Sequence, residues 1–299
     1  MLSPDTVATD LHGHTRFSDG RAEPEDYVAF RAGLGMEVVA VSDHDTFAAV
    51  PRAAEAAREL GVTLLPAMEV TSFIHFGTPR AEQIHILAYF PPERALDGSL
   101  GETRLGARAV DVCLRWRELC LDWIASLPDD QRWFVDPGGP DGALADRRGT
   151  EFPALQDFLE LLARRNPLVY DAFIRHHRAF WEEGKELFAW TPEEAIETIR
   201  ADGALDVVAH PARYRDRARV DRVLDLASGI EVYTSRHKER IAADWRARAE
   251  GANKHWTASS DDHGHSTYLR PPDGTPRRTL ERIYRSEERR VGKECRSRW

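Results

Sequence analysis

Cysteine is scarce in this sequence, and long apolar runs are absent from it. Three cysteines are too few for a disulfide framework. Cys113 and Cys120 lie two helical turns apart in an apolar stretch, where we expect them to be buried core residues. No window approaches the ~18 apolar residues that a membrane span needs, and residues 1–15 lack the basic start and apolar run of a signal peptide. We therefore expect a cytoplasmic protein with no membrane partner.

The chain also lacks an excess of positive charge. Its 41 Lys and Arg residues face 50 Asp and Glu residues, which gives a formal net charge of −9. This balance argues against binding to long duplex nucleic acid or to anionic membranes, because their affinity depends on many basic contacts. A small phosphorylated substrate is compatible with this charge, since bound cations can dominate the field inside a site.

Several catalytic motifs are missing as well. The sequence has no G-x-x-x-x-G-K-[ST] phosphate loop, no G-x-S-x-G nucleophile elbow and no H-E-x-x-H zinc helix. Neither Cys113 nor Cys120 lies in a motif that would make its thiol a nucleophile. These absences argue against P-loop nucleotide hydrolysis, α/β-hydrolase chemistry and the H-E-x-x-H type of metalloprotease.

Strand-like and helix-like segments alternate over residues 1–90 and again over residues 191–284. The predicted strands are Thr6–Leu11, Met36–Val41, Val62–Pro66, Gln83–Phe90, Ala204–Ala209, Gly229–Tyr233 and Trp256–Ser259. The predicted helices between them are Pro24–Gly33, Thr46–Leu60, Thr191–Asp202, Val220–Leu226 and Arg236–Glu250. Thr191 and Glu194 form the pattern of a capping box. This alternation predicts an α/β fold with a mostly parallel sheet or barrel.

Residues 91–190 interrupt the alternation. They are helical where they are periodic, with candidates at Leu105–Leu127, Phe152–Arg165 and Leu168–Leu187. A Gly/Pro/Asp-rich stretch breaks the pattern at Asp129–Gly149. We expect a helical insertion in a barrel made of residues 1–90 and 191–284. It would emerge beside the active site and cover it as a lid, or alternatively serve as an oligomerisation arm remote from the site.

The segment Arg285–Trp299 does not fit the rest of the chain. It has no apolar periodicity and holds six Lys and Arg residues against three Glu residues. Its string RSEERRVGKEC resembles a translated sequencing adapter. We expect a non-native tail that contributes nothing to the fold.

Histidines and carboxylates gather in or directly after the predicted strands. They are His12, His14, Asp19, His44, Glu69, His85, His210, Asp261 and His263. Residues i and i+2 of a strand point to the same face, so His12 should lie beside His14 and Asp261 beside His263. Because the carboxyl ends of parallel strands meet at one rim of a barrel, we expect the whole set to converge there.

So many ionisable groups would be costly to bury together without countercharge. Neutral imidazoles and carboxylates around divalent cations remove that cost, and this donor set suits Mn, Zn or Fe, with Mg also compatible. A single histidine at a strand end is more often structural than a ligand. The combination predicts a centre that holds two or three divalent metal ions.

Seven strings together resemble the motifs of the polymerase and histidinol phosphatase (PHP) superfamily. They are DLHGHTRFSDG, AVSDHDT, LLPAMEVTS, IHILAYF, VVAHPARY, GIEVYTSR and SSDDHG, and they span residues 10 to 264 with the insertion outside the match. The resemblance implies a distorted (βα)7 barrel with a metal cluster at one rim. VVAHPARY and SDHDT look closest to stand-alone phosphoesterases that hydrolyse nucleoside monophosphates, nucleotide bisphosphates or short oligoribonucleotides.

The resemblance also implies three metal positions. The first would be held by His12, His14, Glu69 and Asp261. Glu69 would bridge to a second, completed by His85 and His210. The third would be held by Asp19, His44 and His263.

The reaction we expect is metal-assisted hydrolysis of a small phosphate ester. Two cations about 3.5–4 Å apart would hold a bridging hydroxide, with a pKa lowered toward ~7, that attacks phosphorus in line. We assign catalytic roles to Glu69, Asp261 and His210.

Four further residues are expected to support the centre. Arg213 and Arg236 are candidates to bind the phosphate, with a surface salt bridge as the alternative for each. Asp43 and Asp45 are candidates to orient metal-bound imidazoles.

Two other functions stay open at this stage. A metal-dependent amidohydrolase also opens its barrel with His-x-His, although such enzymes usually have a bridging strand lysine where this chain has Glu69. A non-catalytic metal-binding module is the other alternative, and the completeness of the ligand set argues against it.

Overall fold

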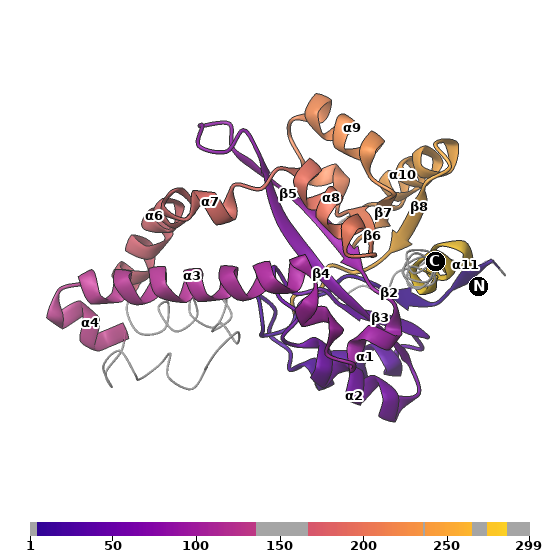
Figure 1. Cartoon of the computed structure of the whole chain (residues 1–299), viewed down its shortest axis with the longest axis horizontal. Coiled ribbons are helices and arrows are strands. Elements are labelled where there is room, and N and C mark those ends of the chain that lie inside the picture. Colours follow the sequence, from indigo (N-terminus) through magenta and orange to yellow (C-terminus); the bar gives the residue numbers. More distant parts are fainter. Residues whose placement is uncertain (1–4, 136–166, 236, 265–273, 286–299) are drawn as a thin grey trace, which may run out of the picture.

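A seven-stranded sheet forms the centre of the molecule (Figure 1). The computed structural model describes residues 5–135, 167–235, 237–264 and 274–285. The strands lie side by side in chain order: β2 (Thr9–Asp10), β3 (Val38–Val41), β4 (Thr63–Ile74), β5 (Glu82–Tyr89), β6 (Leu205–Val208), β7 (Gly229–Tyr233) and β8 (His255–Ala258). A separate antiparallel pair joins β1 (Thr6–Val7) to β9 (Thr275–Pro276).

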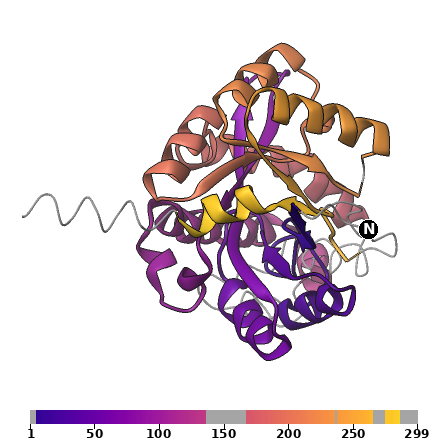
Figure 2. The ribbon, with the colours of Figure 1, turned by 90° about the vertical axis from the view of Figure 1, so that its right-hand side faces the viewer.

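Helices cover the outside of this sheet. They are α1 (Pro24–Gly33), α2 (Val50–Leu60), α8 (Pro192–Ala201), α9 (Arg217–Leu226) and α10 (Glu239–Gly251), whereas α11 (Arg277–Tyr284) packs against the cluster inside the barrel. Figure 2 shows α8–α10 and α1–α2 on opposite sides of the strands. The expected α/β barrel is confirmed, and so is the capping box, since Thr191 Oγ1 accepts from the Glu194 N–H while the Glu194 carboxylate accepts from the Thr191 N–H.

The barrel closes where its first and last strands meet. The Asp261 N–H donates to the His12 carbonyl at 2.9 Å, and the His14 N–H donates to the Asp262 carbonyl at 2.9 Å. These bonds form a parallel bridge between Gly13 and Asp262, just beyond the ends of β2 and β8. The closing contacts are therefore made by the same segments that carry His12, His14 and Asp261.

The direction of β5 differs from a simple (βα) repeat. β5 pairs antiparallel with both β4 and β6, whereas the remaining neighbours in the sheet are parallel. The chain between Ile74 and Glu82 is too short for the crossover of a dozen or more residues that a parallel connection needs. It forms a hairpin instead, with His75 and Gly77 in the left-handed region.

This hairpin corrects the expected positions of Glu69 and His85. β4 runs on to Ile74, so Glu69 lies in the middle of the strand and not near its end. Because β5 is reversed, the rim of the barrel lies at its first half, where His85 pairs across the ribbon with Thr71. Both residues still lie at the level of the rim.

Alternate strand residues divide the core into two parts. In β3, Val39 and Val41 pack against the helices, whereas Val38 and Ala40 point into the barrel. Leu280 and Ile283 of α11 join the interior cluster. Neither α11 nor the β1–β9 pair was predicted from the sequence. The tail beyond α11 lies outside the described residues apart from Arg285.

The insertion begins with two short 3-10 helices, η1 (Pro92–Ala95) and η2 (Ser99–Glu102), and continues as α3 (Arg104–Ser126), α4 (Asp129–Val135), α6 (Pro167–Glu183) and α7 (Lys185–Phe188). Helices α3, α4, α6 and α7 extend sideways from the barrel (Figure 1). Trp123, Ile124 and Phe173 are buried in a cluster within the insertion. Amphipathic helices can bury their apolar faces against one another, and these three residues do so within the insertion.

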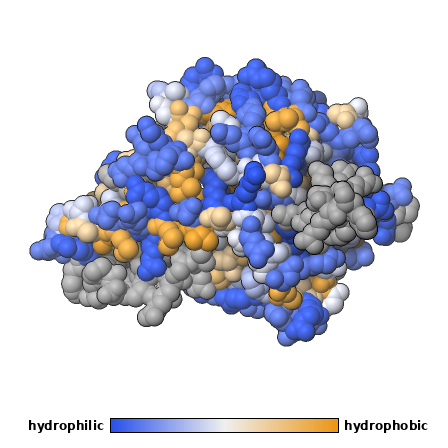
Figure 3. Space-filling model, in the orientation of Figure 1, coloured by the Kyte–Doolittle hydropathy of each residue, from blue (hydrophilic) through white to orange (hydrophobic). Residues whose placement is uncertain are grey.

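Other parts of the insertion surface stay open. Val110 and Leu114 of α3 are exposed, and Figure 3 shows apolar side chains along this helix. The predicted helix Phe152–Arg165 lies outside the described residues. Within the described ranges, no helix has both the length and the apolar character needed to cross a membrane.

Candidate metal centre

The nine residues expected at the rim come together in one cluster. His12, His14 and Asp19 follow β2, His44 follows β3, Glu69 and His85 lie within β4 and β5, His210 follows β6, and Asp261 and His263 follow β8. His210 and Asp261 have positive φ angles of 30° and 56°. Residues other than glycine adopt such angles at a cost, and they are concentrated at functional sites.

Four side-chain atoms form the tightest group in the cluster. The Nε2 atoms of His12 and His14 lie 3.2 Å apart. Glu69 Oε2 lies 3.1 Å from the first and 3.2 Å from the second. Asp261 Oδ1 lies 3.5 Å from His12 Nε2 and 3.4 Å from His14 Nε2. All four residues are buried.

These separations fit a bound cation. Ligand atoms at about 2.0–2.1 Å from a tetrahedral zinc ion are about 3.3 Å from one another. The five distances in the group lie close to that value. Two imidazole nitrogens that face each other beside two carboxylates form a donor set that suits Zn, Mn or Fe.

The Glu69 carboxylate faces five imidazoles. Its Oε2 lies close to His12 and His14, and also 3.2 Å from His44 Nδ1. Its Oε1 lies 2.8 Å from His85 Nδ1 and 2.9 Å from His210 Nε2. Each oxygen of this carboxylate thus faces a different group of imidazoles. A ligand that is shared by two cations requires this arrangement.

A third group surrounds Asp19. Its Oδ2 lies 3.3 Å from His263 Nε2 and 3.7 Å from His44 Nε2, and its Oδ1 lies 3.5 Å from His14 Nδ1. His14 contributes one ring nitrogen here and the other to the group around Glu69. The two groups therefore meet at His14.

The electrostatics of the cluster favour positive charge. Burial alone would lower the pKa of His14, but the carboxylates of Asp19, Asp261 and Glu69 outweigh this effect and raise the pKa to about 10. Burial lowers the pKa of His44 to about 4 despite the same kind of neighbours. Burial would raise the pKa of Glu69, but His12, His85 and His44 hold it well below its usual value. The Glu69 carboxylate therefore stays ionised among these imidazoles, and a divalent cation would supply the same kind of countercharge.

Glu231 is a buried carboxylate that our sequence reasoning did not single out. Its Oε1 lies 2.9 Å from His12 Nδ1, and its Oε2 accepts from the His210 N–H at 2.6 Å. A sequence signal was available, because Glu231 interrupts the apolar run of β7 between Ile230 and Val232, which pack against the helices. Strand alternation points such a residue into the barrel.

We expect Glu231→Gln to weaken metal binding by about 10–100-fold, the effect typical of residues that orient a metal-bound imidazole. The charge that fixes the His12 ring would be lost while the shape is kept. Titration of the metal-free protein against a competing chelator measures this affinity. Asp206→Asn is the matched control, because Asp206 is an equally buried carboxylate that binds Arg200 and Ser228 instead of a histidine. Equal affinities in the two variants would contradict the role of Glu231.

Within the described residues, neither Asp43 nor Asp45 forms a hydrogen bond or ion pair with an imidazole, and their role in orienting metal-bound histidines stays a prediction. Asp43 accepts from the Thr15 N–H, the Thr15 hydroxyl and the Ser18 hydroxyl, and Ser18 Oγ lies 3.3 Å from His14 Nδ1. Asp45 accepts from the Thr71 N–H and from Arg108 of α3, each at 3.1 Å. Asp43 therefore acts on the cluster through Ser18, and Asp45 connects the rim to the insertion.

Arg31 of α1 contacts the two segments that close the barrel. Its guanidinium is buried, lies 3.5 Å over the Tyr27 ring, and donates to Asp262 Oδ2 at 2.6 Å. Its Nε lies 3.4 Å from Asp10 Oδ2. No sequence pattern predicts this contact, because Arg31 and Asp262 are brought together only by closure of the barrel.

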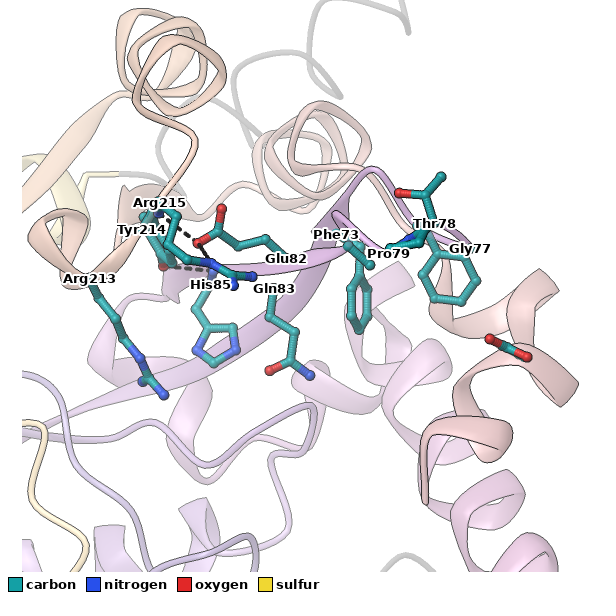
Figure 4. A pocket seen from close by; sticks show the side chains of 13 residues that line it. Phe73, Gly77, Thr78, Pro79, Glu82, Gln83, His85, Arg213, Tyr214 and Arg215 are labelled. Atoms are coloured by element: carbon teal, nitrogen blue, oxygen red, sulfur yellow. Dashed lines mark hydrogen bonds and ion pairs between the residues drawn. The ribbon is translucent and has the colours of Figure 1, made fainter. Parts of the chain in front are cut away.

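Two hollows open beside the cluster and share Gln83 and His85. The smaller has a volume of about 190 Å³ and lies between Asp19, His44 and the α3 residues Val112, Cys113 and Trp116. The larger has a volume of about 840 Å³ and lies between the β4–β5 hairpin and Arg213–Arg215 (Figure 4). Each is large enough to admit part of a small substrate.

Arg213 lines the larger hollow. Its side chain is exposed and forms no ion pair within the described residues, so the alternative of a surface salt bridge is not realised there. In Figure 4 its guanidinium extends to the same side as the His85 ring. Arg236, the other candidate to bind phosphate, lies outside the described residues.

Three comparisons connect this geometry to known proteins. The PHP domain model matches residues 10–229. A 3',5'-nucleoside bisphosphate phosphatase of Chromobacterium violaceum is 26% identical over 268 residues, which cover 85% of this chain and 86% of that protein. The 5'-3' exoribonuclease Rnm of Escherichia coli is 38% identical over 224 residues, which cover 71% of this chain and 68% of that protein.

A solved structure supports the fold. A Chromobacterium violaceum protein described as an amidohydrolase with bound sulfate superposes with a TM-score of 0.63 at 24% identity, covering 92% of this chain and 96% of the other. The family match extends over most of the barrel and includes the segments that carry His12, Glu69 and His210. The chain belongs to the PHP domain family of metal-dependent phosphoesterases.

Proposed function

We propose that this chain hydrolyses small phosphate esters of the nucleotide or short-oligonucleotide class with the help of two or three divalent cations. The observation that carries the proposal is the Glu69 carboxylate, which places one oxygen within 3.2 Å of three imidazoles and the other within 2.9 Å of two more. A purely structural role would not require so many potential ligands around one buried acid.

The first cation would be held by His12, His14, Glu69 and Asp261, and the second by Glu69, His85 and His210, with His44 also facing Glu69. Asp19, His44 and His263 would hold a third, with His14 close by. Mn, Zn, Fe and Mg all remain candidates for these positions. When bound, such ions supply Lewis acidity toward the phosphoryl oxygens and lower the pKa of water to ~7.

The side chains of this chain would position the metal centre and bind the substrate. Glu69, Asp261 and His210 would position the cations at which phosphorus reacts. Glu231 and Arg31 would keep the segments that carry these ligands in place, through their contacts with His210 and Asp262. Arg213 would bind a phosphoryl oxygen through charge-assisted hydrogen bonds, because its guanidinium lines the larger hollow and has no carboxylate partner among the described residues.

The substrate class rests on the relatives and on the insertion. The relatives are described as a nucleoside bisphosphate phosphatase and a 5'-3' exoribonuclease, so both act on nucleotide phosphates. Helix α3 walls the smaller hollow with Val112, Cys113 and Trp116, and Arg108 anchors it to Asp45 at the rim. A wall in this position limits the space for a long chain of nucleotides.

A comparison of substrate lengths tests this proposal. We expect kcat/KM for a nucleoside monophosphate or a very short oligonucleotide to exceed the value for a long single strand, because the α3 wall restricts access and the net charge of −9 disfavours long polyanions. Trp116→Ala should widen the smaller hollow and reduce the preference. Equal or better hydrolysis of the long strand by the unaltered protein would overturn the substrate class.

The amidohydrolase alternative is tested in the same assay series. Glu69 occupies the position at which we would expect a bridging lysine in such an enzyme, and this favours phosphate chemistry. Amide hydrolysis by the metal-loaded protein, with phosphate esters left intact, would reverse the assignment. A protein that binds metal but hydrolyses neither class would be a non-catalytic metal-binding module.

A further inference from the structure

The β4–β5 hairpin leads away from the metal centre as a ladder of paired side chains. Glu69 lies opposite Leu87, Thr71 opposite His85, and Phe73 opposite Gln83. Positions two apart on a strand share a face, so Thr71, His85, Phe73 and Gln83 lie on the face that carries Glu69. The ladder therefore begins at the candidate metal ligands and ends at an aromatic ring beside a side-chain amide.

Figure 4 displays this arrangement directly. The side chains of Arg213, His85, Gln83 and Phe73 extend to the same side of the larger hollow and follow one another in that order. Gln83 is exposed, and it lines both hollows together with His85. A molecule held at His85 would have Arg213 on one side and the pair Phe73–Gln83 on the other.

The spacing suits a nucleotide. Two residues along a strand cover about 6.6 Å, so the Phe73–Gln83 step lies about that far beyond His85. A nucleoside monophosphate separates its phosphorus from its base by one ribose, which is a distance of this order. With the phosphate at the metal centre, the ribose would lie near Thr71 and the base near Phe73 and Gln83.

The side chains of the Phe73–Gln83 pair suit a heterocyclic base. Phe73, which is buried, and Phe76, which is half-buried, form an edge-to-face pair with ring centroids 5.0 Å apart, and both rings line the larger hollow. The Gln83 amide offers both hydrogen-bond donors and an acceptor to the edge of a base. Because the amide can donate or accept, it can form hydrogen bonds with different bases. Stacking on the aromatic ring would favour a nucleotide of any base over a sugar phosphate without a base.

The hairpin is held in place before a ligand arrives. The Glu82 carboxylate accepts from the Arg215 and Asp216 backbone N–H groups at 2.7 and 3.1 Å. His75 Nε2 lies 2.8 Å from Asp216 Oδ2 near the tip. The Tyr214 hydroxyl accepts from the His85 N–H at 2.9 Å. The hairpin and the segment that carries Arg213 are thus fixed relative to each other, so binding a base there costs little ordering.

We propose that Phe73 and Gln83 form a subsite for the nucleobase of the substrate, on the side of the metal centre opposite to Arg213. This inference rests on the proposed phosphoesterase function, and it adds the orientation of the substrate. It assigns selectivity for nucleotides over base-free sugar phosphates to the β4–β5 hairpin, a feature outside the metal ligands.

The test compares a nucleoside 5'-monophosphate with ribose 5-phosphate as substrates of the metal-loaded protein. The unaltered protein should prefer the nucleotide in kcat/KM by on the order of tenfold to hundredfold, the effect of stacking one base on an aromatic ring. Phe73→Leu keeps an apolar side chain but removes the ring, and Gln83→Ala removes the amide. Each should reduce this preference mainly through KM. Arg80→Ala at the exposed tip of the same hairpin is the control, and its preference should stay unchanged.

A second measurement does not depend on turnover of the nucleotide. Adenosine, which has no phosphate, should competitively inhibit hydrolysis of ribose 5-phosphate by the unaltered protein and by Arg80→Ala, and inhibit the Phe73 and Gln83 variants much less. Equal preference and equal inhibition in all four proteins would overturn the subsite. Failure of the unaltered protein to hydrolyse either ester would overturn the proposed function instead, so the two failures are distinguishable.

Discussion

Replacement of Glu69 by glutamine should remove nearly all turnover while the protein still folds. The carboxylate faces two groups of imidazoles, so its loss would affect both cations of the proposed centre at once. Glutamine keeps the size of the side chain but lacks the negative charge, and its amide nitrogen cannot act as a ligand in place of the second oxygen. The loss in kcat should exceed the roughly 10–100-fold typical of residues that only orient a ligand.

The opposite pattern is expected from a matched control. Thr191→Ala removes the N-cap of α8, at a residue that is not among the candidate metal ligands, and should cost about 0.5–2 kcal/mol of stability. Its turnover per folded molecule should stay unchanged. Thermal unfolding and steady-state kinetics on both variants separate the two effects. Near-normal turnover of Glu69→Gln would show that the carboxylate is not shared between cations.

Removal of the metal ions should reduce turnover about as strongly as Glu69→Gln does. Protein purified without chelator should contain at least two divalent cations per chain by elemental analysis, because the cluster offers three overlapping ligand groups. Extensive chelation should abolish hydrolysis and lower the unfolding temperature. The second effect follows because a ligand present at ~100 times its Kd stabilises the folded state by ~2.7 kcal/mol.

Restoration of the metal-free protein with Mn, Zn, Fe or Mg, one at a time, identifies the ions that support turnover. Glu231→Gln should need more metal for recovery than the unaltered protein, because its ring-orienting contact to His12 is weakened. Metal content below one ion per chain with activity intact would rule out the proposed centre. So would hydrolysis that survives complete chelation.

The sequence by itself determined which residues meet at the rim. Short strands ending in polar residues are local features, and Thr191 with Glu194 marks a helix start through contacts only three residues apart. The strand order follows the chain, so residues placed near successive strand ends had to converge once the sheet curved into a barrel. For this reason the convergence of these side chains could be predicted without coordinates, whereas their division into three ligand groups came from the resemblance to the PHP superfamily.

Only the tertiary structure decided how these residues are held. The reversal of β5 depends on the length of the hairpin before it, and it places His85 within a strand and opposite Thr71. The contacts of Glu231 with His12 and of Arg31 with Asp262 join residues 219 and 231 positions apart. No local pattern specifies such pairs, because strand pairing and barrel closure create them, and the same closure sets the distances around Glu69 on which metal binding depends.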